Sequence, residues 1–160
     1  MKLNPSLKNI CPDNLTLEEF SDIVAFVAQF PIKENRKELH VSLKALADNI
    51  AVWLFETNTN YVMRDPKTDE VVGVFLNAVQ SQWWSDEPSL VNTIAFILPE
   101  YRSAELFEKL LRNAEEYAKI EGMKYYFSPV ACNKLDVKKR LLRRLGYTEV
   151  GVIMEAPIRK

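Results

Sequence analysis

Residues that build metal centres and disulfide frameworks are scarce in this sequence. The chain of 160 residues contains one histidine, His40, and two cysteines, Cys11 and Cys132. Two cysteines are too few for a disulfide framework, and neither of them nor His40 has partners at the spacing of a zinc site. We therefore expect no bound metal, and we expect reduced thiols in a cytoplasmic protein.

Long apolar runs and an excess of one charge are also missing. The N-terminal segment lacks the apolar stretch of a signal peptide, and no run approaches the roughly 18 apolar residues of a membrane span. The 21 Lys and Arg residues nearly cancel the 22 Asp and Glu residues, for a formal net charge of -1. The net charge thus gives no indication of a membrane or nucleic-acid partner, and a charged ligand must be recognised locally.

The chain does contain enough apolar sequence for a genuine core. Apolar residues make up 48% of it, and neither a repeat nor a low-complexity linker divides it. A chain of this length forms one domain of ordinary size. We expect a single domain covering residues 1–160.

Two helices are predicted in the first third of the chain. Thr16 and Glu19 form a capping box ahead of a helix with one apolar face, which Pro31 ends. Ser42 is the N-cap of a second helix, whose apolar residues recur at helical spacing over 43–54.

A hairpin of two strands follows these helices. The strands are predicted over 60–64 and 70–79, with a tight polar turn at 65–69. The second strand is apolar on both faces, which indicates a central strand in a sheet covered on both sides. Gly73 within it indicates a bulge or a close approach by another group.

A strand, a long helix and another strand come next. They are predicted over 91–98, 103–121 and 123–130, and such a crossover makes its two strands parallel with a right-handed connection. The step from the first strand to the helix brings unpaired backbone N–H groups and the positive end of a helix dipole to one place. This place favours an anion.

The last part of the chain predicts a short basic helix over 136–145 and a final strand over 148–158. The order is then roughly ααββ-β-α-β-α-β, an α/β fold (α+β mixed sheet) with helices on both faces. The basic helix is either a solvated face or a contact for phosphate, and the final strand offers an edge for a homodimer. Its basic residues, with the one just before it, are Lys134, Lys138, Lys139, Arg140, Arg143 and Arg144.

Three segments resemble the GNAT family of acyl-CoA N-acyltransferases. ILPEYRSAELFEKLL, at 97–111, is similar to the family's acyl-CoA motif, in which a strand ends near a proline and an arginine or glutamine opens a pyrophosphate-binding turn. LLRRLGYTEVG, at 141–151, is similar to the family's closing helix and turn. WWSDEP, at 83–88, resembles small acyltransferase-like proteins of phages. The resemblance covers residues 60–158, and the first two helices match by position only.

The resemblance implies a GNAT-like fold in which two central parallel strands splay apart at a cofactor cleft. Acetyl-CoA would be the acyl donor, its pantetheine arm lying in the gap and its diphosphate at the helix start. Arg102 would add a charge-assisted contact, or is a surface cation, and Asn133 would reach the pantetheine, or caps a helix. The implied cofactor-binding residues are Ile97, Leu98, Arg102, Ser103, Ala104, Glu105, Leu106, Phe107 and Asn133.

Three residues depart from the family pattern. Glu105 and Phe107 stand where the family usually has glycines beside the phosphates, and Glu105 brings a negative charge to that turn. Leu142 stands where the family has a tyrosine that protonates the departing thiolate. An active enzyme would use Tyr147 or water as the acid, or release the thiolate unaided.

A general base is predicted in the loop before the crossover unit. Asp86 and Glu87 are the best-placed carboxylates, although a solvated turn gives them an ordinary role. Trp83 and Trp84 either line an acceptor pocket or clamp the loop on the core.

The predicted function is acyl-CoA-dependent N-acyl transfer, in particular N-acetyl transfer, to an amine of a small molecule or a protein. The alternative is a catalytically degenerate GNAT-fold binding or structural protein, for example one encoded by a phage. The departures at Glu105, Phe107 and Leu142 favour this alternative.

Overall fold

The computed structural model describes residues 3–33, 40–81, 85–127 and 135–150. Several predicted features fall outside these ranges and have no structural description: Trp83, Trp84, Cys132, Asn133, Lys134 and most of the predicted final strand.

Within the described ranges, five strands form one mixed sheet in the order β1-β2-β3-β4-β5. Neighbouring strands are antiparallel except β4 and β5, which are parallel. The parallel pair confirms the predicted crossover. The strands are β1 (Ser6–Asn9), β2 (Tyr61–Arg64), β3 (Val71–Ser81), β4 (Pro88–Ile97) and β5 (Lys124–Tyr126).

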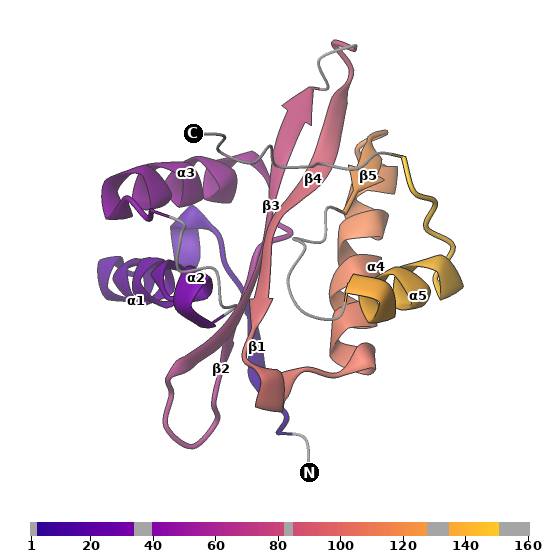
Figure 1. Cartoon of the computed structure of the whole chain (residues 1–160). Coiled ribbons are helices and arrows are strands. Elements are labelled where there is room, and N and C mark those ends of the chain that lie inside the picture. The colour runs from indigo at the N-terminus through magenta and orange to yellow at the C-terminus, as the bar shows by residue number, and fades with distance from the viewer. Residues whose placement is uncertain (1–2, 34–39, 82–84, 128–134, 151–160) are drawn as a thin grey trace, which may run out of the picture.

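Helices cover both faces of the sheet, as predicted (Figure 1). On one face lie α1 (Leu17–Ala28), α2 (Phe30–Lys33) and α3 (Leu43–Glu56). On the other lie α4 (Ala104–Ile120) and α5 (Leu135–Arg144). Within the described ranges, no helix is long and apolar enough to cross a membrane.

The predicted N-caps are present. Thr16 Oγ1 accepts the backbone N–H of Glu19 at 3.1 Å, and Ser42 Oγ accepts that of Ala45 at 3.3 Å. Only this half of the Thr16 capping box forms, because the Glu19 carboxylate turns instead to Lys8, at 2.8 Å. A tertiary ion pair has thus replaced a local capping contact.

The first helix ends earlier than predicted. α1 stops at Ala28 and Gln29 caps it, so Pro31 lies within the separate short helix α2. Proline has no N–H to donate and its ring clashes with the carbonyl four residues earlier. In the first turn of a new helix neither problem arises, since that N–H would have no intrahelical partner.

The core lies on both sides of β3, whose middle is continuously buried. On one side Phe96 packs with α1 and α3, and on the other Phe75 packs with α4. Burying such a side chain contributes about 1.5–3 kcal/mol. A Cβ on Gly73 would come within 3.1 Å of Met63 Sδ and 3.2 Å of an Ile97 side-chain carbon, which confirms the predicted close approach.

Strand β1 was not predicted. Its four residues, SLKN, are mostly exposed and pair only with β2, at the edge of the sheet. A strand so short and polar carries no apolar alternation, so its pairing depends on the partner strand rather than on its own sequence.

Candidate functional site

The predicted anion site is formed by the step from β4 to α4. A single 3-10 turn, Pro99–Tyr101, follows the strand, and Ser103 caps the helix by accepting the backbone N–H of Leu106 at 3.1 Å. The N–H of Phe107 bonds to the carbonyl of Ser103 at 3.1 Å. No acceptor among the described residues binds the N–H groups of Ser103, Ala104 and Glu105. Three adjacent donors are thus available at the positive end of the α4 dipole.

The side chain of Arg102 lies beside these donors. Its Nε donates a hydrogen bond of 2.6 Å to the carbonyl of Ile97, the last residue of β4. This bond holds the guanidinium against the end of the strand, where its charge adds to the field of the helix start.

The backbone of Leu98 is fully bonded within the protein. Its N–H donates to the carbonyl of Val72 on β3 at 2.9 Å, and its carbonyl accepts the N–H of Tyr101 at 3.0 Å. Successive residues of a strand direct their backbone groups to opposite sides. The backbone N–H and carbonyl of Ile97 therefore point away from β3, toward the β5 side. The backbone N–H of Leu98 points toward β3 instead.

The two departures from the family turn have different surroundings. Glu105 is exposed in the first turn of α4. Phe107 points into the core and meets Phe127 edge to face, with ring centroids 5.3 Å apart. The Phe107 side chain is thus turned away from the donors, and the Glu105 carboxylate is the group that alters the charge at this turn.

Strand β4 contains a bulge that sequence reasoning missed. Leu76 pairs with Ile94, but the next residue, Asn77, pairs with Asn92, so Thr93 has no partner of its own on β3. The parallel pairing with β5, over the residues that the structure describes, ends just before this point, at Val91 with Tyr126. The bulge thus follows directly after the last described pair between β4 and β5.

Buried amides surround this bulge. Asn77 and Asn60 are fully buried and Asn92 is 4% exposed. The N–H of Asn77 donates to Asn60 Oδ1 at 2.7 Å, and the hydroxyl of Tyr125 donates to Asn77 Oδ1 at 3.3 Å. Burial raises the pKa of Tyr125 well above its ordinary value. The sequence signal of this network is an asparagine within each of two mainly apolar strands.

The candidate bases lie at the opposite end of β4 from Arg102. Asp86 and Glu87 are exposed and precede Pro88, in the region where β3 and β4 extend beyond the helices (Figure 1). Six residues separate Glu87 from Thr93, which is about 20 Å of extended strand at about 3.3 Å per residue. The structure therefore does not bring these carboxylates to the bulge or to the anion site.

The closing helix supplies no acid at Leu142, and the candidate acid Tyr147 is not poised to donate a proton. Leu142 is 7% exposed and packs in the core beneath α4. Tyr147 donates its hydroxyl to Glu115 Oε1 at 2.7 Å, and burial, with this carboxylate, raises the pKa of Tyr147 far above its ordinary value.

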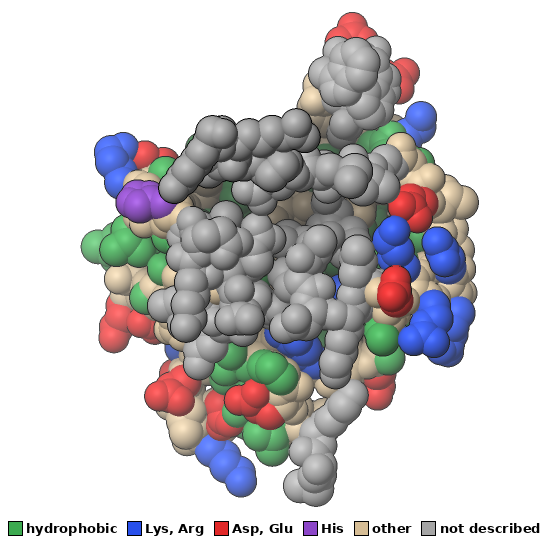
Figure 2. All heavy atoms as spheres, in the orientation of Figure 1, with side chains coloured by type: hydrophobic (Ala, Val, Ile, Leu, Met, Phe, Trp, Pro, Cys, Tyr) green, Lys and Arg blue, Asp and Glu red, His purple; other side chains and the backbone are tan. Residues whose placement is uncertain are grey.

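Basic side chains gather on the side of α4 and α5 (Figure 2). On α5, Lys139 and Arg143 pair with Glu149 at 3.0 and 3.5 Å. Arg140 and Arg144 are exposed on the same helix. Part of the predicted basic face is therefore paired within the protein, and part remains open to an anion.

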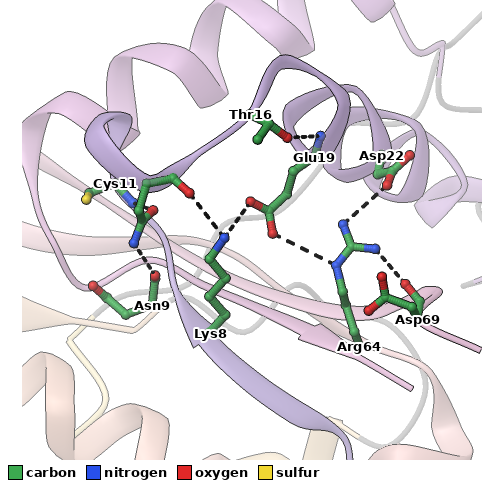
Figure 3. Close-up of polar contacts among 9 residues, drawn as sticks. Lys8, Asn9, Cys11, Thr16, Glu19, Asp22, Arg64 and Asp69 are labelled. Carbon is green, nitrogen blue, oxygen red and sulfur yellow. Dashed lines mark hydrogen bonds and ion pairs between the residues drawn. The ribbon is translucent and has the colours of Figure 1, made fainter. Parts of the chain in front are cut away.

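A second polar feature is a groove of about 480 Å³ between α1 and strands β1 and β2. Figure 3 shows Lys8 and Arg64 reaching from the strands to Glu19 and Asp22 on α1. Lys8 lies 2.8 Å from Glu19, and Arg64 lies 3.2 Å from Asp22. These pairs hold α1 against the sheet edge.

A metal centre has no support among the residues that the structure places. His40 is exposed, and no group of three or more His, Cys, Asp or Glu residues within the described ranges could hold a metal ion.

No family model matches this sequence, and no curated protein matches it. The structure, in contrast, is similar to solved acetyltransferases over nearly the whole chain. A possible acetyltransferase from Clostridium difficile 630 aligns with a TM-score of 0.61 and 13% identity, over 98% of this chain and 99% of that one. An aminoglycoside 6′-N-acetyltransferase from Acinetobacter baumannii aligns with a TM-score of 0.60 and 12% identity, again over 98% and 99%.

A third similar structure contains a ligand related to the predicted acyl donor. It is AAC(6′)-Iy in complex with the bisubstrate analogue CoA-S-monomethyl-acetylneamine, with a TM-score of 0.59 and 10% identity, over 98% of this chain and 99% of that one. Identities this low show the fold alone. The fold is that of the GNAT acetyltransferases, which confirms the resemblance at the level of architecture.

Proposed function

We propose that this protein is an acyl-CoA-dependent N-acyltransferase that transfers an acetyl group from acetyl-CoA to an amine. The observation that carries the proposal is the step from β4 to α4, where three backbone N–H groups with no acceptor among the described residues lie beside Arg102. The proposal is supported by the fold shared with solved acetyltransferases, one of them bound to a CoA-derived analogue.

The CoA diphosphate would bind at the start of α4. The N–H groups of Ser103, Ala104 and Glu105 would donate to its oxygens, and the Arg102 guanidinium would add charge. Leu106 and Phe107 would contribute only through the helix dipole, because Ser103 already accepts both of their N–H groups. The exposed Glu105 carboxylate weakens this site without blocking it, since water screens its charge.

The pantetheine arm would lie along the side of β4 that faces β5. The alternation established at Leu98 directs the backbone of Ile97, Ala95 and Thr93 to this side. We therefore keep Ile97 in the proposed site through its N–H, since Arg102 binds its carbonyl, and we exclude Leu98, whose N–H and carbonyl are both bonded. Asn133, which follows β5 in the sequence, remains a proposed contact of the arm.

The reaction would take place at the bulge. The amine nitrogen, as the free base, attacks the thioester carbonyl, and bulge N–H groups polarise that carbonyl. The C–N bond forms, the attacking nitrogen loses a proton to solvent water, the C–S bond breaks, and the thiolate leaves with the electron pair. A thiol of pKa near 8.5 is a fair leaving group, so the thiolate can depart without an acid in the place of Leu142.

Direct proton transfer to Asp86 or Glu87 does not fit this site. A base must come within hydrogen-bond reach of the ammonium, or one water away, and about 20 Å of strand separates these carboxylates from the bulge. We propose instead that the ammonium releases its proton to solvent water before attack.

A binding protein without catalysis is the second candidate. It is favoured by Leu142, which is buried and cannot donate a proton, and by the negative charge of Glu105 at the diphosphate turn. Such a protein could bind CoA or another anion without transferring an acyl group.

Two measurements separate these candidates. Thermal unfolding is followed with and without acetyl-CoA, because a ligand at 100 times its Kd stabilises the folded state by about 2.7 kcal/mol. Release of free thiol from acetyl-CoA is then measured with a panel of primary amines that includes aminoglycosides. A stabilisation together with amine-dependent thiol release supports the enzyme, and stabilisation alone supports the binding protein. No stabilisation at millimolar acetyl-CoA would overturn the proposed acyl donor.

A further inference from the structure

The side chains of Asn92 and Thr93 both bond to the strand opposite the bulge. Thr93 Oγ1 donates to the carbonyl of Leu76 at 3.0 Å, and Asn92 Nδ2 donates to the same carbonyl at 3.0 Å. Asn92 Nδ2 also lies 3.2 Å from Asn77 Oδ1 and 3.3 Å from the carbonyl of Ile94. Two side chains of the bulged strand therefore converge on one carbonyl of β3.

These bonds fix the register of β4 at a defined residue. Below the bulge β4 pairs as Leu76 with Ile94, and above it as Asn77 with Asn92. If the bulge formed one residue earlier or later in β4 than Thr93, a neighbouring side chain would turn to the other face of the sheet. Asn92 is nearly fully buried, so its amide would then lose its acceptors at a cost that water does not offset.

The network also links the bulge to the end of β5. Asn77 Oδ1 receives hydrogen bonds from Asn92 Nδ2 and from the Tyr125 hydroxyl, so β3, β4 and β5 meet at this one oxygen. Tyr126, the next residue of β5, makes the last described pair with β4. The end of the described pairing between β4 and β5 is thus held by side chains and not only by backbone pairing.

We propose that Asn92 and Thr93 are positioning residues, which hold the β4 bulge so that its backbone N–H groups polarise the carbonyl of bound acetyl-CoA. This inference rests on the proposed function and assigns two side chains to its chemistry. Neither side chain touches the acyl group. They act through the backbone that they hold, and their substitution should therefore change the polarisation of the carbonyl more than the affinity for the CoA moiety.

The test uses the full-length protein and acetyl-CoA labelled with ¹³C at the carbonyl. Isotope-edited infrared spectroscopy measures the C=O stretch of the bound thioester, which falls in frequency when hydrogen bonds polarise the carbonyl. This measurement needs no acceptor amine. The Kd for acetyl-CoA and the slow release of thiol to water are measured on the same samples.

The informative variants are Thr93→Val and Asn92→Ala. Thr93→Val keeps the shape and removes only the hydroxyl donor, and Thr93→Ser restores that donor. Thr16→Val is the matched control: it makes the same change as Thr93→Val, but the Thr16 hydroxyl accepts the N–H of Glu19 at the start of α1, on the face of the sheet opposite α4. It should lose thermal stability without changing the chemistry.

Thr93→Val and Asn92→Ala should lose most of the frequency shift and slow thiol release by up to about 100-fold, the scale of a small misplacement of reacting groups. Their Kd for acetyl-CoA should stay within about threefold of the wild type, a change of less than 1 kcal/mol. Thr93→Ser and Thr16→Val should keep the wild-type shift. If Asn92→Ala does not fold, the comparison of Thr93→Val with Thr93→Ser decides alone.

Two failures are distinguishable. If the wild-type protein does not bind acetyl-CoA, the proposed function and this inference both fall. If it binds and shifts the stretch, but Thr93→Val keeps the wild-type shift, or Thr16→Val loses as much of the shift as Thr93→Val does, the function stands and the positioning role is overturned.

Discussion

The phenol of Tyr101 donates a hydrogen bond to Asp65 Oδ2, which joins the turn before α4 to the turn of the β2–β3 hairpin. The other oxygen of Asp65 accepts the backbone N–H groups of Lys67, at 2.7 Å, and Thr68, at 3.1 Å. One carboxylate thus shapes the hairpin turn and anchors the residue that precedes Arg102. The proposed anion site is held in place by a contact with a residue far from it in sequence.

This contact predicts a pH-dependent stability that Tyr101→Phe removes. The hydrogen bond from Tyr101 lowers the pKa of Asp65 below the ordinary 3.8 and, in return, raises the pKa of Tyr101 from 10.0 to about 12. The stabilisation is therefore complete between these ordinary values. It is lost as pH falls through the lowered pKa of Asp65, and as pH rises from 10 toward about 12.

Urea unfolding of the wild type and Tyr101→Phe from pH 3 to pH 11 measures this effect. The variant should be less stable at pH 7, and the difference should shrink at both ends of the range. Tyr117→Phe is the control, because the Tyr117 hydroxyl has no hydrogen bond to any residue that the structure describes. A difference between wild type and Tyr101→Phe that does not vary with pH would contradict the contact.

Replacing Arg102 should weaken acetyl-CoA binding. Its guanidinium is held by the Ile97 carbonyl at 2.6 Å, beside the free N–H groups of the helix start. Hydrogen bonds to charged groups contribute about 1.5–3 kcal/mol, so Arg102→Gln should raise the Kd by roughly 10–100-fold. Arg102→Lys should recover only part of the affinity, because lysine lacks the planar fork that can bond a carbonyl and a phosphate together.

Calorimetry at two salt concentrations checks the Arg102 prediction. The wild-type Kd should rise with salt, and the Arg102→Gln Kd should rise less. Lys44→Gln removes a cation on α3 that pairs with Asp48 at 2.6 Å, on the face of the sheet opposite α4. It should leave the Kd unchanged. Equal losses in both variants would point to net charge alone.

Glu105 gives a prediction of opposite sign. Its carboxylate is exposed in the first turn of α4, where it stabilises the helix but opposes a diphosphate. A charge at this position is worth about 0.3–1 kcal/mol, so Glu105→Gln should lower the Kd for acetyl-CoA by roughly two- to fivefold while slightly lowering the melting temperature.

The matched control for Glu105 is Glu108→Gln, one turn further along α4 and also exposed. The field of a helix end is confined to its first turn, so this variant should have a smaller effect on binding. If Glu105→Gln leaves the Kd unchanged while Arg102→Gln raises it, the diphosphate lies on the β4 side of the turn and not over Glu105.

The elements with strong local signals were predictable from the sequence. Each of these elements follows from a few neighbouring residues. They are the N-caps at Thr16 and Ser42, the strand around Gly73 that is apolar on both faces, and the start of α4 at Ser103. These are contacts within one turn or one strand, where pattern and structure are closely linked.

Features that depend on two distant segments were not predictable. The bulge at Thr93 exists because β4 has one residue more than β3 across a shared register, and no pattern within β4 shows this. The separation of Asp86 and Glu87 from the anion site depends on the full length of β4, which begins before the predicted residue 91. The capping box of Thr16 and Glu19 also forms only in part for such a reason. The Glu19 carboxylate pairs with Lys8, a residue of strand β1, which was not predicted.

Tyr147 provides the last prediction, on the source of the proton in acyl transfer. Its hydroxyl already donates to Glu115 at 2.7 Å, and Glu115 is also held by Arg112 at 2.8 Å. Burial and the carboxylate raise its pKa far above that of a thiol, so transfer of its proton to a thiolate is strongly uphill.

Tyr147→Phe should therefore change the maximal rate of thiol release by less than about threefold, in contrast to the roughly 100-fold or greater contribution of a general acid. It should lower stability by about 1–3 kcal/mol, because the partly buried Glu115 loses a donor. A large fall in rate at unchanged Kd for acetyl-CoA would instead show that Tyr147 leaves Glu115 during the reaction and acts as the acid that Leu142 cannot be.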